Sequence, residues 1–193
     1  MTIRFSSIEA RWNAADDSAE LWIDGRSVID MFKGPGPEKP DGISPFARRH
    51  AKECVLQSLA SYRDPSVRGN DELPPGVLEL AVCPACAGWQ CGSFSVRLTR
   101  HGDDVQWASP DWAAPDMDDA DVEQEPVEPG DPMSWFPQRL TFRAAEYDAA
   151  LDRVASLMKE HPWPVLPELA TAPMKLLAWF TKRGRTSAAT PSE

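Results

Sequence analysis

The sequence has no apolar run long enough to cross a membrane, and its first residues carry no export signal. A membrane-spanning helix needs about 20 consecutive apolar residues, and no stretch of the 193 residues approaches that length. Residues 1–5 lack the positively charged and then apolar pattern of a signal peptide. These absences predict a cytoplasmic protein with no membrane partner, in a compartment where thiols stay reduced.

Histidines are few, and the common catalytic motifs are missing. The three histidines are His50, His101 and His161, and none of them lies in a nucleophile or metal motif. The sequence has no Gly-x-Ser-x-Gly, no His-Glu-x-x-His and no P-loop. Cys54 follows His50 by four residues and could pair with it as nucleophile and base, although such a pair is more often one helix face turned inward. The sequence therefore favours a binding protein over an enzyme.

Negative charge prevails over the chain, but one stretch supplies it. The formal net charge is −10 at pH 7. Between Asp103 and Asp131 there are eleven carboxylates and no Lys or Arg. Removing these eleven from the 30 acidic residues leaves 19, against 20 Lys and Arg, so the rest of the chain carries +1. It also has no basic stretch with interleaved aromatic residues, so nucleic acid is not an expected partner.

Residues 110–137 combine prolines with carboxylates, which is typical of a long solvated loop. They lack the glycine and the spacing of a calcium-binding loop. Tryptophans stand on both sides of the carboxylates, and aromatic anchors beside dense negative charge are typical of a protein-binding site. We therefore predict a module that binds a basic protein, for example an immunity-type inhibitor of a basic toxin; a loop with no partner is the alternative. The predicted partner-binding residues are Trp107, Trp112, Asp116, Asp118, Asp119, Asp121, Glu123 and Trp135.

The pattern of apolar residues predicts an α+β fold, in which an antiparallel meander is covered by two to three helices. Asp24-Gly25 predicts a hairpin over residues 21–30, because both turn residues tolerate positive φ. Ser44 and Pro45 are typical of the start of a helix, which would run to about residue 61. The other predicted strands span 77–82, 93–100, 105–108 and 139–142. The next helix spans 144–160, and one face of it carries Tyr147, Leu151, Val154, Leu157 and Met158. We expect one domain over residues 1–162, then an amphipathic helix and a frayed tail over 163–193.

Three of the four cysteines, Cys83, Cys86 and Cys91, fall within nine residues. Cys83 and Cys86 form a Cys-x-x-Cys pair at a predicted strand end, and two thiolates at this spacing can face one zinc ion at about 2.3 Å. Cys91 would be a third ligand, and Cys54 or His50 a fourth. The alternative is a hairpin of small, buried thiols. A strand follows the pair, so a thioredoxin-like redox site is not expected. Apart from zinc, the sequence predicts no cofactor.

The segment Cys83–Gly92 reads Cys-Pro-Ala-Cys-Ala-Gly-Trp-Gln-Cys-Gly, and Val105-Gln106-Trp107 and Leu140-Thr141-Phe142 follow it along the chain. In these elements the chain resembles a group of bacterial proteins, best represented in actinobacteria, that share a strand–Cys-Pro-x-Cys-Gly-x-x-Gly-Cys-Gly–strand hairpin. Ala87 and Gln90 stand where the group usually has glycine. The resemblance covers roughly residues 77–151. It implies the antiparallel fold, but no activity, because the group has no known reaction.

Overall fold

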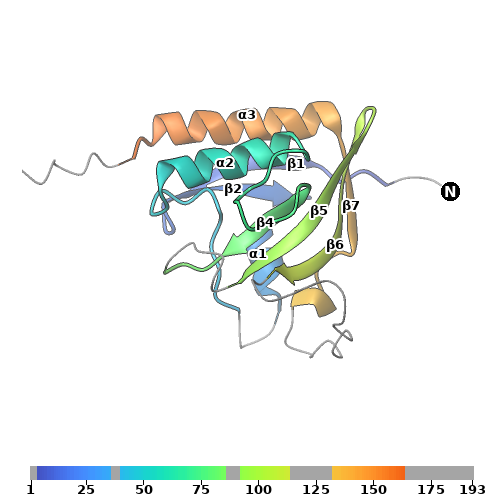
Figure 1. Cartoon of the computed structure of the whole chain (residues 1–193), viewed down its shortest axis with the longest axis horizontal. Helices are drawn as coiled ribbons and strands as arrows, with labels where there is room; N and C mark the ends of the chain where they lie inside the picture. The colour runs from blue at the N-terminus through green and yellow to red at the C-terminus, as the bar shows by residue number, and fades with distance from the viewer. Residues whose placement is uncertain (1–3, 36–39, 86–91, 114–131, 164–193) are drawn as a thin grey trace, which may run out of the picture. The chain divides into compact units, whose positions relative to one another are not determined.

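The computed structural model holds two antiparallel sheets and three α-helices in the part of the chain that it describes, which confirms the predicted α+β fold (Figure 1). The described residues are 4–35, 40–85, 92–113 and 132–163. Contacts divide the chain into a compact unit, Met1–Pro162, and a second unit, Trp163–Glu193. The predicted C-terminal helix and tail lie outside the described residues, apart from Trp163.

The first sheet is built from three consecutive strands, β1 (Ile8–Asn13), β2 (Ser18–Ile23) and β3 (Arg26–Ser27). Asp24 and Gly25 form the turn between β2 and β3 with φ of 49° and 79°, as the hairpin prediction requires. The second arm of this hairpin is only two residues long, because α1 (Val28–Lys33) begins there. The Ser27 hydroxyl caps α1 by accepting hydrogen bonds from the main-chain N–H groups of residues 29 and 30.

The second sheet is a four-stranded meander in the order β4 (Val77–Val82), β5 (Ser93–His101), β6 (Asp104–Ala113) and β7 (Arg139–Arg143). The predicted strands are confirmed, but β6 continues to Ala113, so the loop predicted from residue 110 starts later than expected. The pairing of β4 with β5 shifts register between Glu79 and Ala81. Such a bulge bends a strand and changes the direction of a side chain.

Helix α2 (Lys52–Arg63) begins seven residues later than the sequence predicts, since Ser44 was the expected cap and Pro45 the expected first residue. The Ser44 hydroxyl does accept a bond from Phe46 N at 3.1 Å, but it donates to Ala19 O at 2.7 Å and so serves a turn. Ile43 exchanges two main-chain hydrogen bonds of 3.0 Å with Val82. These pairings with strand residues keep the backbone before α2 extended or turned, and they override the local helix signal.

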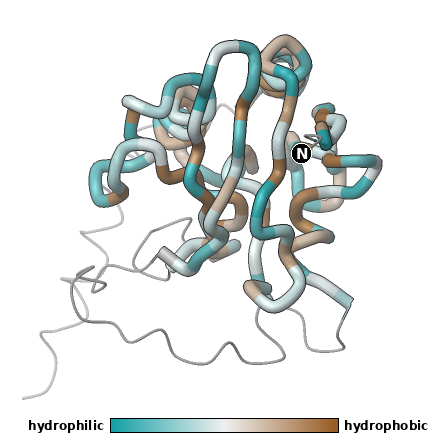
Figure 2. Tube along the Cα trace, turned by 90° about the vertical axis from the view of Figure 1, so that its right-hand side faces the viewer, coloured by the Kyte–Doolittle hydropathy of each residue, from teal (hydrophilic) through white to brown (hydrophobic). Residues whose placement is uncertain are grey.

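Main-chain hydrogen bonds join the two sheets on both sides. Ser6 N, just before β1, donates to Thr141 O of β7 at 2.8 Å. On the other side, residues 43–47 pair with β4 through Ile43 and with β2 through a 3.3 Å bond from Ala19 N to Phe46 O. The hydrogen-bonded segments of the compact unit therefore follow one another around a closed ring. Figure 2 shows hydrophobic positions along the strands and hydrophilic turns between them.

Helix α3 (Ala144–Glu160) packs along β1, and its buried face is the one that the sequence predicts. An aromatic cluster fills the space between α3, α2 and the second sheet. In it, Trp107 meets Phe142 edge-on at a centroid distance of 5.3 Å and Tyr62 of α2 at 5.9 Å. Each of these rings is at most 1% exposed. The buried residues of α3 are Tyr147, Ala150, Leu151, Val154, Leu157 and Met158.

Candidate functional site

Trp107 is a core residue, not the surface anchor that its neighbouring carboxylates suggested. It is 1% exposed, and its indole Nε1 donates to the Tyr147 hydroxyl at 3.2 Å. The reason is the period of β6, since Val105 and Trp107 alternate with half-buried residues and share the inward face. Trp107 is therefore not available to a partner.

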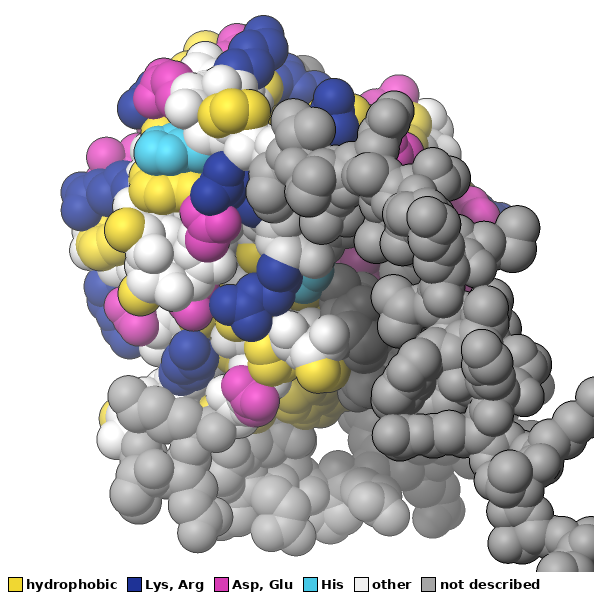
Figure 3. All heavy atoms as spheres, turned by 90° about the vertical axis from the view of Figure 1, so that its left-hand side faces the viewer, with side chains coloured by type: hydrophobic (Ala, Val, Ile, Leu, Met, Phe, Trp, Pro, Cys, Tyr) yellow, Lys and Arg dark blue, Asp and Glu magenta, His cyan; other side chains and the backbone are white. Residues whose placement is uncertain are grey.

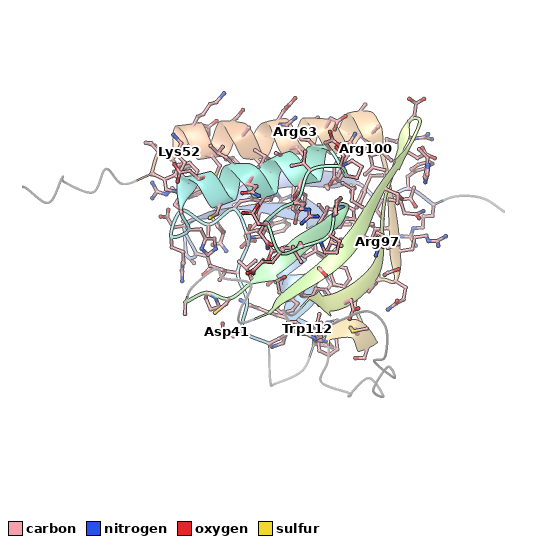
Figure 4. The ribbon with its side chains drawn as sticks, in the orientation of Figure 1. Asp41, Lys52, Arg63, Arg97, Arg100 and Trp112 are labelled. Atoms are coloured by element: carbon pink, nitrogen blue, oxygen red, sulfur yellow. The ribbon has the colours of Figure 1, made fainter. Side chains whose placement is uncertain are left out.

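Trp112 and Trp135 are both half-buried and both contact α1. Trp112 meets the Phe32 ring edge-on at a centroid distance of 5.7 Å, and it lies at the end of the second sheet near α1 (Figure 4). Trp135 donates from Nε1 to Met31 O at 3.0 Å. Its ring also lies against Gly34, where a Cβ atom would overlap the indole. One short helix therefore fixes both tryptophans.

These two contacts fix the ends of the acidic segment, which we define as residues 114–131. The predicted residues Asp116, Asp118, Asp119, Asp121 and Glu123 lie in this segment and outside the described residues. The chain leaves α1 through Trp112 and returns to it through Trp135. The described residues on both sides of the acidic segment therefore contact α1.

Two of the four predicted metal ligands lie in the described residues. Cys54 is exposed in the first turn of α2, and Cys83 is half-buried after β4. Cys86 and Cys91 lie outside the described residues. Within the described part of the chain, no group of three His, Cys, Asp or Glu side chains could hold a metal ion. Arg49 Nη1 donates to Pro84 O at 3.3 Å, which ties the start of the cysteine hairpin to the turn before α2.

A pocket of about 320 Å³, here called the Glu79 pocket, lies between α2, the turn before it, the loop 69–72 and β4. His50 and Cys54 both line it, so the structure brings the predicted pair to one cavity. They do not share a helix face, because His50 precedes the first residue of α2. Burial lowers the pKa of His50, and the positive charge of Arg49 lowers it further. His50 is therefore a neutral imidazole at pH 7.

Glu79 is the residue that sequence reasoning missed. Its side chain lines the pocket, yet the residue is only 8% exposed. Burial raises the pKa of Glu79 above its ordinary value of 4.5, and hydrogen bonds from Ser93 and Asn70 oppose this rise. The signal in the sequence was one carboxylate inside the apolar run 77–82. A charged residue at such a position is either paired or functional.

The loop that carries Asn70 holds its amide in a fixed orientation. Asn70 Oδ1 accepts hydrogen bonds from Glu72 N and Leu73 N, each at 2.9 Å. This arrangement is an Asx turn, and it holds Asn70 on the wall of the pocket, near Glu79. The Tyr62 hydroxyl of α2 donates to the main-chain oxygen of Glu79. The backbone that carries the carboxylate is therefore held by α2.

A second pocket, also of about 320 Å³, lies beside β2 and α1. Its buried carboxylate is Glu20, which accepts bonds of 2.7 Å from Asn13 Nδ2 and from the Ser27 hydroxyl. Ser27 also caps α1. Glu20 thus joins the β1–β2 hairpin to the start of α1, which is a structural role.

Comparisons with protein-family models, with curated proteins and with solved structures gave no match. The resemblance to the actinobacterial group therefore stays a prediction. Among the described residues, no helix has both the length and the apolar character needed to span a bilayer. Any proposal about function accordingly depends on the two features above, the acidic segment between its anchored ends and the Glu79 pocket.

Proposed function

We propose that this protein is a protein-binding module that presents its acidic segment to a basic protein partner. The observation that supports the proposal is the attachment of Trp112 and Trp135 to α1, which holds both ends of the segment at one place. The segment has eight carboxylates and no Lys or Arg. A loop that is closed at both ends has less conformational entropy to lose on binding than a free tail.

The rest of the chain has no comparable excess of negative charge. Outside residues 114–131 the sequence has 22 carboxylates against 20 Lys and Arg. On the face shown in Figure 3, basic and acidic side chains are interspersed. A local negative field on a nearly balanced body steers a basic partner toward one site and raises the association rate at low salt.

An immunity-type inhibitor of a basic toxin is a narrower form of the same proposal. A cationic nuclease or membrane-active toxin carries the matching charge, and an acidic loop can cover a basic active site. Charge complementarity supports this form, together with the two aromatic residues at the ends of the loop, since Trp is enriched among residues that dominate binding energy.

The test neutralises the segment without shortening it. Asp118, Asp119, Asp121 and Glu123 are replaced together by Asn or Gln, and the full chain is used to capture proteins from a lysate of the organism that encodes it. We expect a basic protein to be retained by the wild type at low salt. For the isolated pair, the association rate should fall about tenfold or more in the variant, and its salt dependence should flatten.

A matched control carries the same change of charge on the described surface. It replaces four exposed carboxylates outside the segment, Asp41, Glu53, Asp103 and Glu146, by their amides. We expect this control to keep most of the association rate. Equal losses in the two variants would show that only net charge matters, and they would remove the segment from the proposal.

A second candidate function is a zinc-stabilised domain, and one observation favours it. Val82 lines the same pocket as Cys54 and His50, and the chain runs from Val82 directly into Cys83. The Arg49–Pro84 hydrogen bond keeps this part of the cysteine hairpin beside the turn before α2. The thiol of Cys54 and the hairpin thus belong to the same region of the fold.

Elemental mass spectrometry on tag-free, reduced protein tests the zinc candidate. About one zinc per chain, lost on chelation together with the fold, would support it. A Cys83→Ser/Cys86→Ser variant should then lose the metal, whereas Cys54→Ser should lose it only if Cys54 is the fourth ligand. Protein that folds without metal would leave the acidic segment as the candidate to pursue.

A further inference from the structure

The Glu79 pocket contains a buried carboxylate that neither of these functions uses, although Cys54 and His50 of the zinc candidate also line it. A volume of about 320 Å³ is at the lower end of the range found for small-molecule sites. Its walls come from three regular or well-supported parts of the fold: α2, strand β4 and the Asx-turn loop that Asn70 closes. Lys52, labelled in Figure 4, marks the first turn of α2, and Cys54 lies in that same turn at the pocket. The cavity does not depend on the acidic segment.

The charges that line the cavity are all of one sign. Its described carboxylates are Glu79 on β4 and Asp71 and Glu72 on the loop, and no Lys or Arg of the described residues lines it. Among these described lining residues, His50 is the one basic side chain, and it is neutral because burial and Arg49 lower its pKa. The remaining polar groups include the amides of Asn70 and Gln57. Negative charge inside a concave site attracts cations more strongly than the same charge on a flat surface.

Glu79 is built into the pocket in a way that suits a counter-ion. It is only 8% exposed, at a β-bulge beside which β4 changes register. Burial disfavours its ionised form and raises its pKa, and the nearby side chains of Asn70 and Ser93 partly offset this rise. Bulges beside a cavity are a common means of aiming a side chain. A buried carboxylate gains most when a cation arrives.

We propose that the Glu79 pocket binds a small molecule with a cationic nitrogen, an ammonium or a guanidinium group, for which Glu79 is the counter-ion. Asp71 and Glu72 are exposed and draw the cation toward the cavity. Asn70 lines the pocket beside Glu79, and the aliphatic surface of Pro45 and Val82 contacts the carbon chain of the ligand. The cation has two sources, a free metabolite or an Arg or Lys side chain of another protein.

Cys54 gives a direct measure of occupancy, because its thiol is exposed and its residue lines the pocket. The rate at which iodoacetamide alkylates Cys54 is measured by peptide mass spectrometry, with N-acetylcysteine in the same sample as the reference. The probes are N-butylguanidinium and N-butylurea, which have nearly the same shape and differ in charge. We expect saturating N-butylguanidinium to slow alkylation of Cys54 about tenfold and N-butylurea to leave it unchanged.

Two variants locate the effect. Glu79→Gln keeps the size of the side chain and should weaken N-butylguanidinium binding about tenfold or more, as calorimetry would measure. Glu146→Gln removes an equal charge from the exposed surface of α3 and should bind as the wild type does. Because the two probes are compared on the wild-type protein, the outcome does not depend on whether the Glu79 variant folds.

A third probe separates the two sources of the cation. The capped peptide acetyl-Gly-Arg-Gly-amide carries the same guanidinium on a protein-like backbone. Protection by the small guanidinium alone assigns the pocket to a metabolite, and protection by the peptide as well assigns it to a partner side chain. No protection by either cation, or equal protection by the guanidinium and the urea, overturns the proposal. The binding of a basic protein to the acidic segment is measured separately and can fail or succeed independently.

Discussion

The acidic segment and the Glu79 pocket hold negative charge in opposite ways. In the segment, eight carboxylates follow one another along 18 residues, and the described structure fixes only the two ends, through Trp112 and Trp135. In the pocket, one carboxylate that is only 8% exposed lies on β4, with Asn70 and Ser93 nearby. Dense charge along a chain acts at a distance and is screened by salt, whereas a single buried charge acts on contact and depends on shape.

The comparison also explains why one feature was visible in the sequence and the other was not. A run of carboxylates without Lys or Arg is a local property, so composition alone predicts it. The pocket needs Glu79, Asn70 and His50, which come from three parts of the chain that meet only when β4, the loop and the turn before α2 are folded together. Local sequence patterns do not show which distant residues the fold brings together.

The largest expected effect distinguishes the tryptophans. Trp107→Ala removes a ring that is 1% exposed and that packs on Tyr62 and Phe142. We expect the free energy of unfolding to fall by about 3–5 kcal/mol, because a cavity replaces the ring. Urea unfolding followed by circular dichroism measures this loss. A variant that is already unfolded in the absence of urea would also be consistent with a loss of this size.

Trp112→Ala is the matched control, because the same residue type is removed from a half-buried position. It should cost clearly less stability than Trp107→Ala, and it should weaken the binding of a basic partner. Equal stability losses would contradict the division of the tryptophans into a core residue and a surface anchor.

The strand and helix patterns were largely sufficient for the fold, and the exceptions have physical causes. The Asp24-Gly25 hairpin and the inward face of α3 depend on local geometry and are confirmed. The helix predicted from Ser44 begins only at Lys52, because Ile43 and Phe46 make main-chain bonds with strands that are distant in sequence. Trp107 was assigned to the surface for its acidic neighbours, although the alternation along β6 places it inside.

A smaller effect is expected where Trp135 holds the end of the acidic segment. Gly34 has φ of 61° and ψ of −171°, a conformation that is almost confined to glycine. In Gly34→Ala, the added Cβ also overlaps the indole of Trp135. We expect a loss of about 2–3 kcal/mol, measured by urea unfolding, from backbone strain and from displacement of the ring.

Gly25→Ala supplies the control, since Gly25 has a φ of 79° and nothing within 4 Å of the added Cβ. Gly25→Ala should lower the free energy of unfolding by about 1 kcal/mol, because only the left-handed backbone conformation disfavours alanine there. In a Trp135→Ala background, Gly34→Ala should lose part of its effect, because the overlap is gone. If the two glycine variants cost the same, the contact between Gly34 and Trp135 does not fix the end of the segment.

The smallest effect concerns Glu79, where stability and binding should move in opposite directions. Burial raises the pKa of Glu79 above 4.5 in the folded protein. Between 4.5 and the raised pKa, the folded state therefore holds more protons than the unfolded state, so this group's contribution to stability falls as the pH rises. Gln cannot ionise, so Glu79→Gln should be as stable as the wild type near pH 4 and more stable at pH 7.5.

The comparison of two urea curves at each pH measures this gain, whose sign follows from the raised pKa of Glu79. The other ionisable residues that line the pocket, His50, Asp71, Glu72 and Cys54, are the same in both proteins. A gain in stability with a loss of N-butylguanidinium binding is the behaviour of a binding residue that is kept at a cost to the fold. A variant that is less stable at both pH values, by the same amount, would instead give Glu79 a structural role, and the contrast between the acidic segment and a functional buried charge would disappear.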